Sequence, residues 1–236
     1  MRKVIYLLLL IILSGCSTQS IHDIYHEAII GAMTPDSSKI YQNLTDINLT
    51  NKNLIWKEID GEKYLLCVTW KEKISKYENY VDSTYYNSGK SDIWVTISPE
   101  LLNKLQVENF NDRDLRIKQL LGLPPTSNYN YFVEFWVKPD DLFRPCADSE
   151  INDSECELCF PGNTDSTHIF WINDYRIESY YQCELYDKYP WTQLGYTYDW
   201  NPKNKSNIGL SEFVIKQNSK VKINNICTTD EYLNNE

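Results

Sequence analysis

Most apolar residues of this chain fall in short runs, where they alternate with polar residues or are densely β-branched and aromatic. The runs 92–97 (DIWVTI), 131–139 (YFVEFWVKP), 209–215 (GLSEFVI) and 220–227 (KVKINNIC) have this pattern. It is typical of β-strands, whose side chains point alternately to the two faces of a sheet. The tyrosine-rich run 77–90 indicates a further strand that ends in a turn. These runs predict that a sheet is the main element of the fold.

Two pairs of runs predict β-hairpins. Asp60-Gly61 separates NLIWKEI from EKYLLCVTW, and Asp-Gly is a strong hairpin signal because a type I′ turn needs a positive φ at both central residues. A second hairpin is predicted over 168–186, where HIFWIN and YRIESYYQCELY meet at Asn173-Asp174.

Helical patterns are fewer. The run 98–106 (SPELLNKLQ) predicts a helix with Ser98 as its N-cap. The run 112–122 (DRDLRIKQLLG) predicts a second helix, capped by Asn111 and ended by Gly122.

The part of the chain that precedes these runs is mixed. IHDIYHEAII (21–30) has apolar residues on one side and predicts a short amphipathic helix, which Gly31 and Pro35 end. We therefore expect residues 16–50 to form a tether that docks partly on the domain. Residues 51–236 are expected to form one α+β domain around a mainly antiparallel sheet, with about two short helices and disulfide staples.

The first residues of the chain carry an export signal. Arg2 and Lys3 precede the apolar run VIYLLLLIIL (4–13), and small residues follow it. A charged start, about ten apolar residues and a small-residue cleavage zone are the parts of a secretory signal peptide. The run is too short to span a membrane, which takes about 20 apolar residues. Residues 1–15 are therefore expected to be a signal peptide.

The end of this leader, Leu13-Ser14-Gly15-Cys16, resembles the lipobox of bacterial lipoproteins. The resemblance covers only the leader. It implies that Cys16 is lipidated, with acyl chains such as palmitate, and becomes the mature N-terminus on the cell envelope. Two or more buried chains, at about 0.8 kcal/mol per methylene, hold a protein stably on a membrane. In that family Ser17, in place of an aspartate, implies the outer membrane facing the periplasm of a Gram-negative cell. The alternative is the outer face of the plasma membrane.

Composition and charge limit the classes of partner that we expect. The chain of 236 residues has a formal net charge of −10, and its 18 tyrosines outnumber its 7 tryptophans and 7 phenylalanines. An acidic chain gains nothing from phosphate backbones, so we expect no nucleic-acid partner. We also expect the lipid on Cys16, and not a basic patch, to hold the protein on the membrane. Tyrosine suits half-buried sheets and binding surfaces alike, and no cofactor is predicted.

Cysteine usage agrees with export. The seven cysteines, less Cys16, leave an even set, which in an exported protein favours disulfides, although six cysteines allow fifteen pairings. The candidates for disulfides are Cys67, Cys146, Cys156, Cys159, Cys183 and Cys227.

Three of these cysteines lie in the acidic segment 146–159 (CADSEINDSECELC). Cys156-x-x-Cys159 has the spacing of zinc ligands, and Cys183 or His168 would help to complete a site. A redox pair would need a helix after it, where the turn-forming FPG stands instead. In an oxidising compartment we expect disulfides and no metal.

Candidate catalytic residues are few. His168 stands alone in the domain at the start of a predicted strand, which is usually a structural position, and no serine lies in a G-x-S-x-G motif. A carboxyl group buried beside aromatic rings has a raised pKa and could act as a general acid in glycoside hydrolysis. The candidates are Glu134, Glu178 and Glu212, although a solvated face or an ion pair is the interpretation that we favour for each.

The run 189–202 (YPWTQLGYTYDWNP) is the most unusual of the chain. Its aromatic residues either pack against the sheet or form a surface that stacks on sugar rings or anchors a protein partner. The candidates for binding are Tyr189, Trp191, Tyr196, Tyr198 and Trp200, of which the last three alternate onto one face.

Together these features predict a lipid-anchored, non-enzymatic binding protein of the cell envelope, whose partner is a protein or a glycan. The alternative is a cell-envelope glycan hydrolase that uses paired carboxylates.

Overall fold

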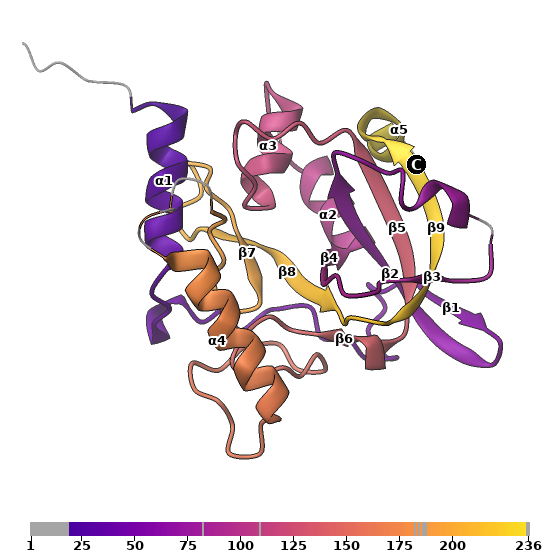
Figure 1. The fold of residues 1–236 in the computed structure, drawn as a ribbon. Coiled ribbons are helices and arrows are strands. Elements are labelled where there is room, and N and C mark those ends of the chain that lie inside the picture. Colours follow the sequence, from indigo (N-terminus) through magenta and orange to yellow (C-terminus); the bar gives the residue numbers. More distant parts are fainter. Residues whose placement is uncertain are drawn as a thin grey trace, which may run out of the picture.

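A mainly antiparallel sheet is the frame of the molecule (Figure 1). The computed structural model describes residues 19–81, 83–108, 110–181, 183, 185 and 188–234. Within them the sheet has nine strands in the order β3-β9-β5-β2-β4-β8-β6, with β1 paired to β2 and β7 paired to β8. The strands are β1 (Trp56–Ile59), β2 (Glu62–Lys71), β3 (Tyr86–Asn87), β4 (Ile93–Ile97), β5 (Tyr131–Val137), β6 (Leu142–Phe143), β7 (Tyr196–Tyr198), β8 (Ile208–Ile215) and β9 (Lys220–Thr228).

Helices lie around this sheet, most of them on one side of it (Figure 1). The predicted α+β domain with a mainly antiparallel sheet is confirmed. The described residues hold five α-helices instead of about two, together with three short 3-10 helices. The α-helices are α1 (Ile21–Ala32), α2 (Ser98–Gln106), α3 (Arg113–Leu120), α4 (Ser166–Tyr180) and α5 (Thr229–Asn234), and the 3-10 helices are η1 (Ser37–Lys39), η2 (Glu78–Tyr80) and η3 (Pro139–Asp141).

The hairpin predicted at Asp60-Gly61 is confirmed. Strands β1 and β2 pair in register, with Ile59 opposite Glu62. Asp60 and Gly61 have φ angles of 54° and 81°, which is the positive pair that a two-residue type I′ turn requires.

The sheet separates two cores because successive side chains of each strand point to opposite faces. On one face, strand residues pack under the segments 47–54 and 74–86; they include Leu65, Cys67, Val95, Phe135 and Phe213. On the other face, Val68, Trp70, Phe132 and Leu210 pack against Leu101 of α2 and Ile117 of α3.

The two predicted helices form, with different N-caps. Asp112, and not Asn111, caps α3 and accepts a hydrogen bond from Leu115 N at 3.0 Å. Ser98 is the first helical residue of α2 and not its cap. The end of α3 at Gly122 is confirmed, since its φ of 67° is the left-handed conformation that closes a helix.

Helix α4 replaces the hairpin predicted over 168–186, which is wrong. Asp165 caps the helix by accepting a hydrogen bond from Thr167 N at 2.7 Å. Four residues of α4 follow helical spacing: His168, Trp171, Ile172 and Tyr175. Three of them, His168, Trp171 and Tyr175, contact Phe143 or Trp94 of the sheet. Their aromatic and β-branched composition resembles that of a strand, but the contacts that α4 makes with strand residues decide its conformation.

Helix α4 is held on the sheet by aromatic contacts. The ring centroids of Trp171 and Phe143 are 4.8 Å apart, and those of Trp171 and Trp94 are 5.9 Å apart. Trp171 also donates its indole N–H to Asp92 Oδ2 at 3.0 Å. These contacts place α4 beside the β4-β8-β6 side of the sheet.

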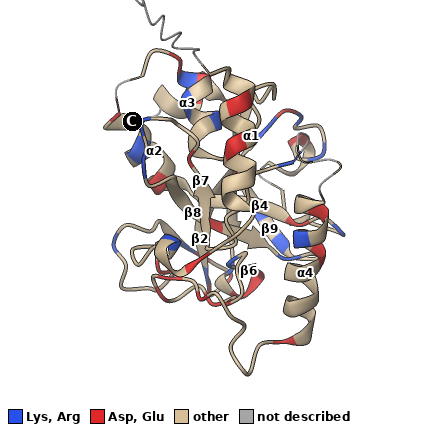
Figure 2. Cartoon of the chain, turned by 90° about the vertical axis from the view of Figure 1, so that its left-hand side faces the viewer, with Lys and Arg blue, Asp and Glu red and all other residues tan. Residues whose placement is uncertain are grey.

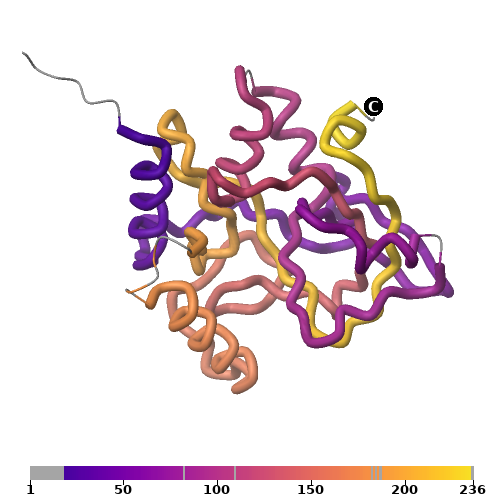
Figure 3. The backbone as a smooth tube through the Cα atoms, turned by 45° about the horizontal axis from the view of Figure 1, so that its top comes forward, coloured from indigo at the N-terminus to yellow at the C-terminus, as the bar shows by residue number. Residues whose placement is uncertain are grey.

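The segment expected to be a tether packs into the same domain from Ile21 onward. Helix α1 runs through Gly31 to Ala32 and packs Tyr25 and Ile29 against Trp200, and Leu44 joins another buried cluster. Figures 1 and 3 both show α1 beside the segment around β7. This segment is therefore part of the fold.

A buried ion pair fixes the chain after β7 to α3. Arg116 donates two hydrogen bonds to Asp199, at 2.9 Å and 2.8 Å, and both side chains are almost fully buried. Such bidentate geometry compensates the cost of removing the two charges from water.

The predicted membrane anchor involves residues that the structure does not describe. Cys16 and the rest of the predicted leader lie outside the described residues. Among the residues described, none of the helices is long and apolar enough to span a membrane. Acidic and basic residues are interspersed over the elements in view in Figure 2.

Candidate functional site

A cavity of about 480 Å³ lies on the helical face of the sheet. Its volume is in the range of small-molecule binding sites. Helices α2 and α3 cover one part of this face and α4 covers another, so the cavity occupies the sheet between them.

Three neighbouring strands form its floor. In the register of the sheet Val68 of β2 lies opposite Thr96 of β4, and Thr96 lies opposite Glu212 of β8. These three residues therefore form one row across the sheet, and all of them line the cavity together with Trp70 and Trp94.

The walls come from helices and loops. Helix α4 contributes Tyr175, Glu178 and Ser179, and the segment that follows it contributes Lys188, Tyr189, Pro190 and Trp191. The opposite wall is formed by Leu121, Gly122, Leu123, Tyr129 and Phe132. Elements from most of the chain are thus needed to enclose the site.

Three of the lining rings meet at steep angles. Trp94 and Tyr175 have ring centroids 5.7 Å apart at 57°, and Trp94 and Trp191 lie 6.2 Å apart at 81°. Tyr175 and Trp191 close the set at 6.2 Å and 71°. We call these three rings the aromatic corner.

The tryptophans offer ring surface and not N–H donors. Trp70 donates its indole N–H to Thr229 Oγ1 at 2.9 Å, and Trp191 donates to the carbonyl of Pro145 at 3.0 Å. Because these donors already have acceptors within the protein, a ligand meets the π faces and edges of these rings.

Glu212 is the polar group of the cavity floor. The residues described give its carboxylate no hydrogen bond and no ion pair. Burial raises the pKa of Glu212 to about 8, since an unpaired negative charge loses its hydration in such surroundings. The group is therefore mostly protonated at neutral pH in the free protein.

The structure brings three of the five predicted binding residues to the cavity. Tyr189, Trp191 and Tyr198 line it, and Tyr189 keeps 49% of its surface exposed. Tyr196 and Trp200 do not line it: Trp200 packs on α1, and Tyr196 donates its hydroxyl to the carbonyl of Lys39 at 2.9 Å. For these two residues the core interpretation holds.

Two of the three predicted carboxylates, Glu178 and Glu212, also line the cavity. Glu212 is on a strand, as predicted, whereas Glu178 is on α4. Glu134 lies outside the cavity lining and accepts hydrogen bonds from Ser98 Oγ and Asn224 Nδ2, both at 2.8 Å. It is part of a structural polar cluster.

Sequence reasoning missed most of the aromatic lining. The sequence assigns Trp70, Trp94 and Tyr175 only to secondary structure and Tyr129 to no element, because nothing near them marks a site. The one usable signal is that Trp70 and Trp94 both lie within predicted strands, where large aromatic residues gather on sheet faces.

The cysteine loop is stapled by one disulfide. Cys146 is bonded to Cys156, whereas the other described cysteines, Cys67, Cys159, Cys183 and Cys227, are free thiols, the first and last of them buried. Of the six candidates for disulfides, two are therefore bonded to each other in this structure and four are not. His168, expected to begin a strand, lies in the first turn of α4 with Nε2 2.7 Å from the carbonyl oxygen of Cys146, and burial lowers its pKa.

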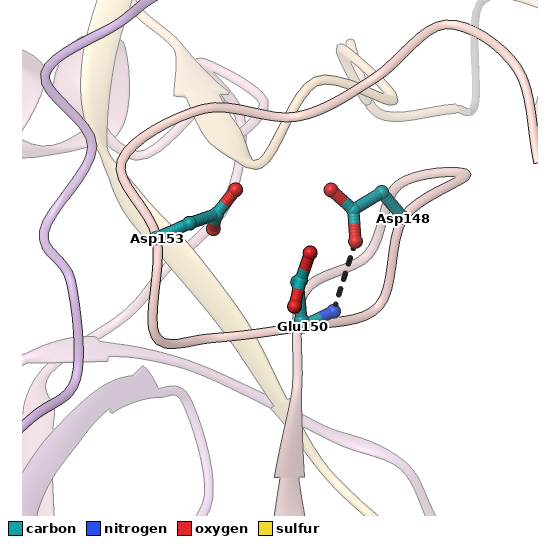
Figure 4. Close-up of side chains that lie close together, drawn as sticks. All are labelled: Asp148, Glu150 and Asp153. Carbon is teal, nitrogen blue, oxygen red and sulfur yellow. Dashed lines mark hydrogen bonds between the residues drawn. The ribbon is translucent and has the colours of Figure 1, made fainter. Parts of the chain in front are cut away.

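The same loop holds an acidic triad. Carboxylate oxygens of Asp148, Glu150 and Asp153 lie within 4.8 Å of one another, and Asp148 accepts a hydrogen bond from Glu150 N (Figure 4). Burial raises the pKa of Asp148 to about 6, and the neighbouring acids add to the shift.

A buried guanidinium balances this triad. Arg144 is fully buried, and its Nη2 is 3.6 Å from Asp153 Oδ1. Arg144 also donates to the carbonyl oxygens of Glu150 and Thr45, each at 3.0 Å. Asp153 thus places negative charge beside the buried arginine, as the burial of a cation requires.

Comparison with known proteins adds no identity. No protein-family model, no curated protein and no solved structure matches this chain.

Proposed function

We propose that this chain is a lipid-anchored protein of the bacterial cell envelope that binds a protein or glycan partner through the aromatic cavity. The lipobox-like leader supports the anchor on Cys16 and an envelope location. The acidic composition supports a partner other than nucleic acid.

The observation that carries the binding function is the cavity itself. It lies where three strands meet α4, and the rings of Trp70, Trp94, Tyr175 and Trp191 line it together with polar side chains that include Glu212. Concave aromatic sites with a small number of polar groups are typical of ligand binding. Tyr189 at its rim is accessible to a partner larger than the cavity.

Substitution at the rim tests this function. Tyr189→Ala removes a lining ring that is 49% exposed, so the fold should be preserved while the affinity for the envelope partner falls about tenfold, the effect of losing about 1.4 kcal/mol. The measurement is crosslinking in intact cells, followed by equilibrium binding of the captured glycan or protein. Tyr181→Ala is the matched control, because Tyr181 is 63% exposed and does not line the cavity. Equal binding by both variants would contradict the proposal.

A specific observation favours one second candidate, glycan hydrolysis. Glu178 and Glu212 line the same cavity, and the raised pKa of Glu212 suits a general acid. In that case Glu178→Gln and Glu212→Gln would each abolish the release of reducing ends from envelope glycan, and Glu134→Gln would not. Binding without any turnover by the unmodified protein excludes this candidate.

A further inference from the structure

We propose that the ligand of the cavity carries an ammonium group, which lies against the aromatic corner and pairs with the Glu212 carboxylate. This ligand class rests on the binding function proposed above and specifies the chemistry of its partner. An envelope polymer would present such a group on an amino sugar, a peptide N-terminus, a lysine-like side chain or a quaternary amine.

The unpaired carboxylate of Glu212 favours a cationic ligand. Glu212 faces the cavity from the middle of a strand, and the described residues leave it without a hydrogen bond or an ion pair. A charge in this position is costly unless a partner compensates it. A cationic ligand supplies the opposite charge, and Glu212 releases its proton to solvent when it pairs with that charge.

The rings of the aromatic corner favour the same ammonium group. The π face of an aromatic ring is its negative side, so it attracts a cation that lies within about 6 Å of the ring centroid. Trp94, Tyr175 and Trp191 have steeply inclined planes, at 57° to 81° to one another. The three rings are therefore direct neighbours in one part of the lining, where Trp171 also packs on Tyr175 with ring centroids 4.3 Å apart, and a cation would meet the ring surface that faces the cavity.

The carboxylate and the corner are neighbours. Trp94 pairs with Val214, two residues from Glu212 on the same face of β8, and such diagonal neighbours are within reach of an aromatic side chain. The hydroxyl of Tyr180 donates to the carbonyl of Trp191, and the charge of Glu212 contributes to the raised pKa of Tyr180. Tyr180 is therefore near both Trp191 and Glu212.

The remaining lining argues against a neutral polyol, which needs several directional hydrogen bonds. Thr197 already donates to Leu120 O at 2.6 Å and accepts from Leu210 N at 2.8 Å. The indole N–H groups of Trp70 and Trp191 are also engaged within the protein. Val68, Leu101 and Leu123 give the lining an apolar part that suits an apolar body attached to the ammonium group, and the other charged residues of the lining are Lys71, Lys188 and Glu178.

A pair of isosteric probes tests the charge. Choline and its neutral isostere 3,3-dimethylbutan-1-ol differ in one atom and one charge, and their binding to the full-length protein in non-ionic detergent is measured by calorimetry. A desolvated cation–π contact of about 2 kcal/mol predicts that choline binds about 30-fold more tightly. This comparison uses the unmodified protein and does not depend on a variant that folds.

Substitution then tests the residue. Glu212→Gln should weaken choline at least tenfold and leave the isostere within about twofold. Glu134→Gln is the matched control, because this carboxylate lies on the same face of the sheet, outside the cavity, and should change neither affinity.

The outcomes separate the ligand class from the function. The ammonium proposal is overturned if the two probes bind with equal affinity, or if Glu212→Gln leaves the affinity for choline unchanged. If a neutral glycan fragment binds instead and Tyr189→Ala weakens it, the binding function stands without the ammonium group. If neither probe nor fragment binds and Tyr189→Ala leaves envelope capture unchanged, both proposals fail.

Discussion

Glu212 shows how a single side chain takes its chemistry from its surroundings. On the sequence it is one of three glutamates on predicted strands, with nothing to distinguish it. In the structure Glu134 is hydrogen-bonded to two neighbours, whereas Glu212 has no such partner among the described residues. The difference between a structural carboxylate and a reactive one is therefore set by the residues that pack around each.

The raised pKa of Glu212 predicts a pH dependence of stability. The folded protein keeps a proton up to a pH of about 8, whereas the unfolded chain releases it near its ordinary pKa of 4.5. The free energy of unfolding should therefore fall as the pH rises from 4.5 to 8, by at most about 1.4 kcal/mol per unit, and less where water in the cavity screens the charge.

Urea unfolding between pH 5 and pH 8 measures this dependence. Glu212→Gln should lose the part of the slope above about pH 6, because glutamine does not titrate, and Glu134→Gln should keep it. Below about pH 6 Asp148, whose pKa burial raises to about 6, adds its own dependence in both variants. A slope that is the same in both variants would show that Glu212 does not hold its proton in the folded protein.

Among the elements, α1 shows how the N-terminal segment docks on the domain. Residues 16–50 were expected to be a tether that docks partly, and α1 packs its buried face on Trp200, with the ring centroids of Tyr25 and Trp200 5.5 Å apart. Gly31 lies within the helix, where an added Cβ would be 2.8 Å from the Tyr198 hydroxyl. The glycine permits close packing here instead of ending the helix.

Two adjacent isoleucines of α1 test whether this docking stabilises the domain. Ile29 is fully buried and Ile30 is 50% exposed. Ile29→Ala should lower the free energy of unfolding by about 2–4 kcal/mol because it leaves a cavity, and Ile30→Ala should change it by less than about 0.5 kcal/mol. Equal, small effects in chemical denaturation would instead favour a loosely attached tether.

At the scale of the whole molecule, one disulfide holds the acidic loop beside the Arg144 guanidinium. The bridge joins cysteines separated by 10 positions. The sulfur of Cys156 also lies close to the backbone of Gly195, where an added Cβ would be 2.6 Å from it and φ is 74°. The loop is thereby packed against the segment that leads into β7.

Removal of this bridge should destabilise the domain. The double substitution Cys146→Ser and Cys156→Ser should lower the free energy of unfolding by about 2–3 kcal/mol, since a closed loop of this length restricts the unfolded chain. The matched control is Cys159→Ser with Cys183→Ser, two exposed free thiols, which should change little. Thermal or urea unfolding of both double variants measures these effects. A larger loss of unfolding free energy in the control variant would contradict the assignment of the bridge.

The sequence by itself determined the features that depend on a few consecutive residues. The Asp60-Gly61 turn needs only two positive φ angles, the strands follow from alternation over short runs, and the left-handed Gly122 ends α3. The predicted leader, with its resemblance to a lipobox, also rests on a few consecutive residues, and it stays a prediction. The α+β class follows because many such signals agree.

Only the tertiary structure decided α4, the choice among the cysteines and the cavity. Helix α4 has the composition of a strand, and its contacts with Trp94 and Phe143 make it a helix. The cavity joins Val68 to Glu212 across the sheet, and no short window of sequence contains both. Burial, charge compensation and ring geometry arise from such distant pairs, so they exist only once the chain is folded.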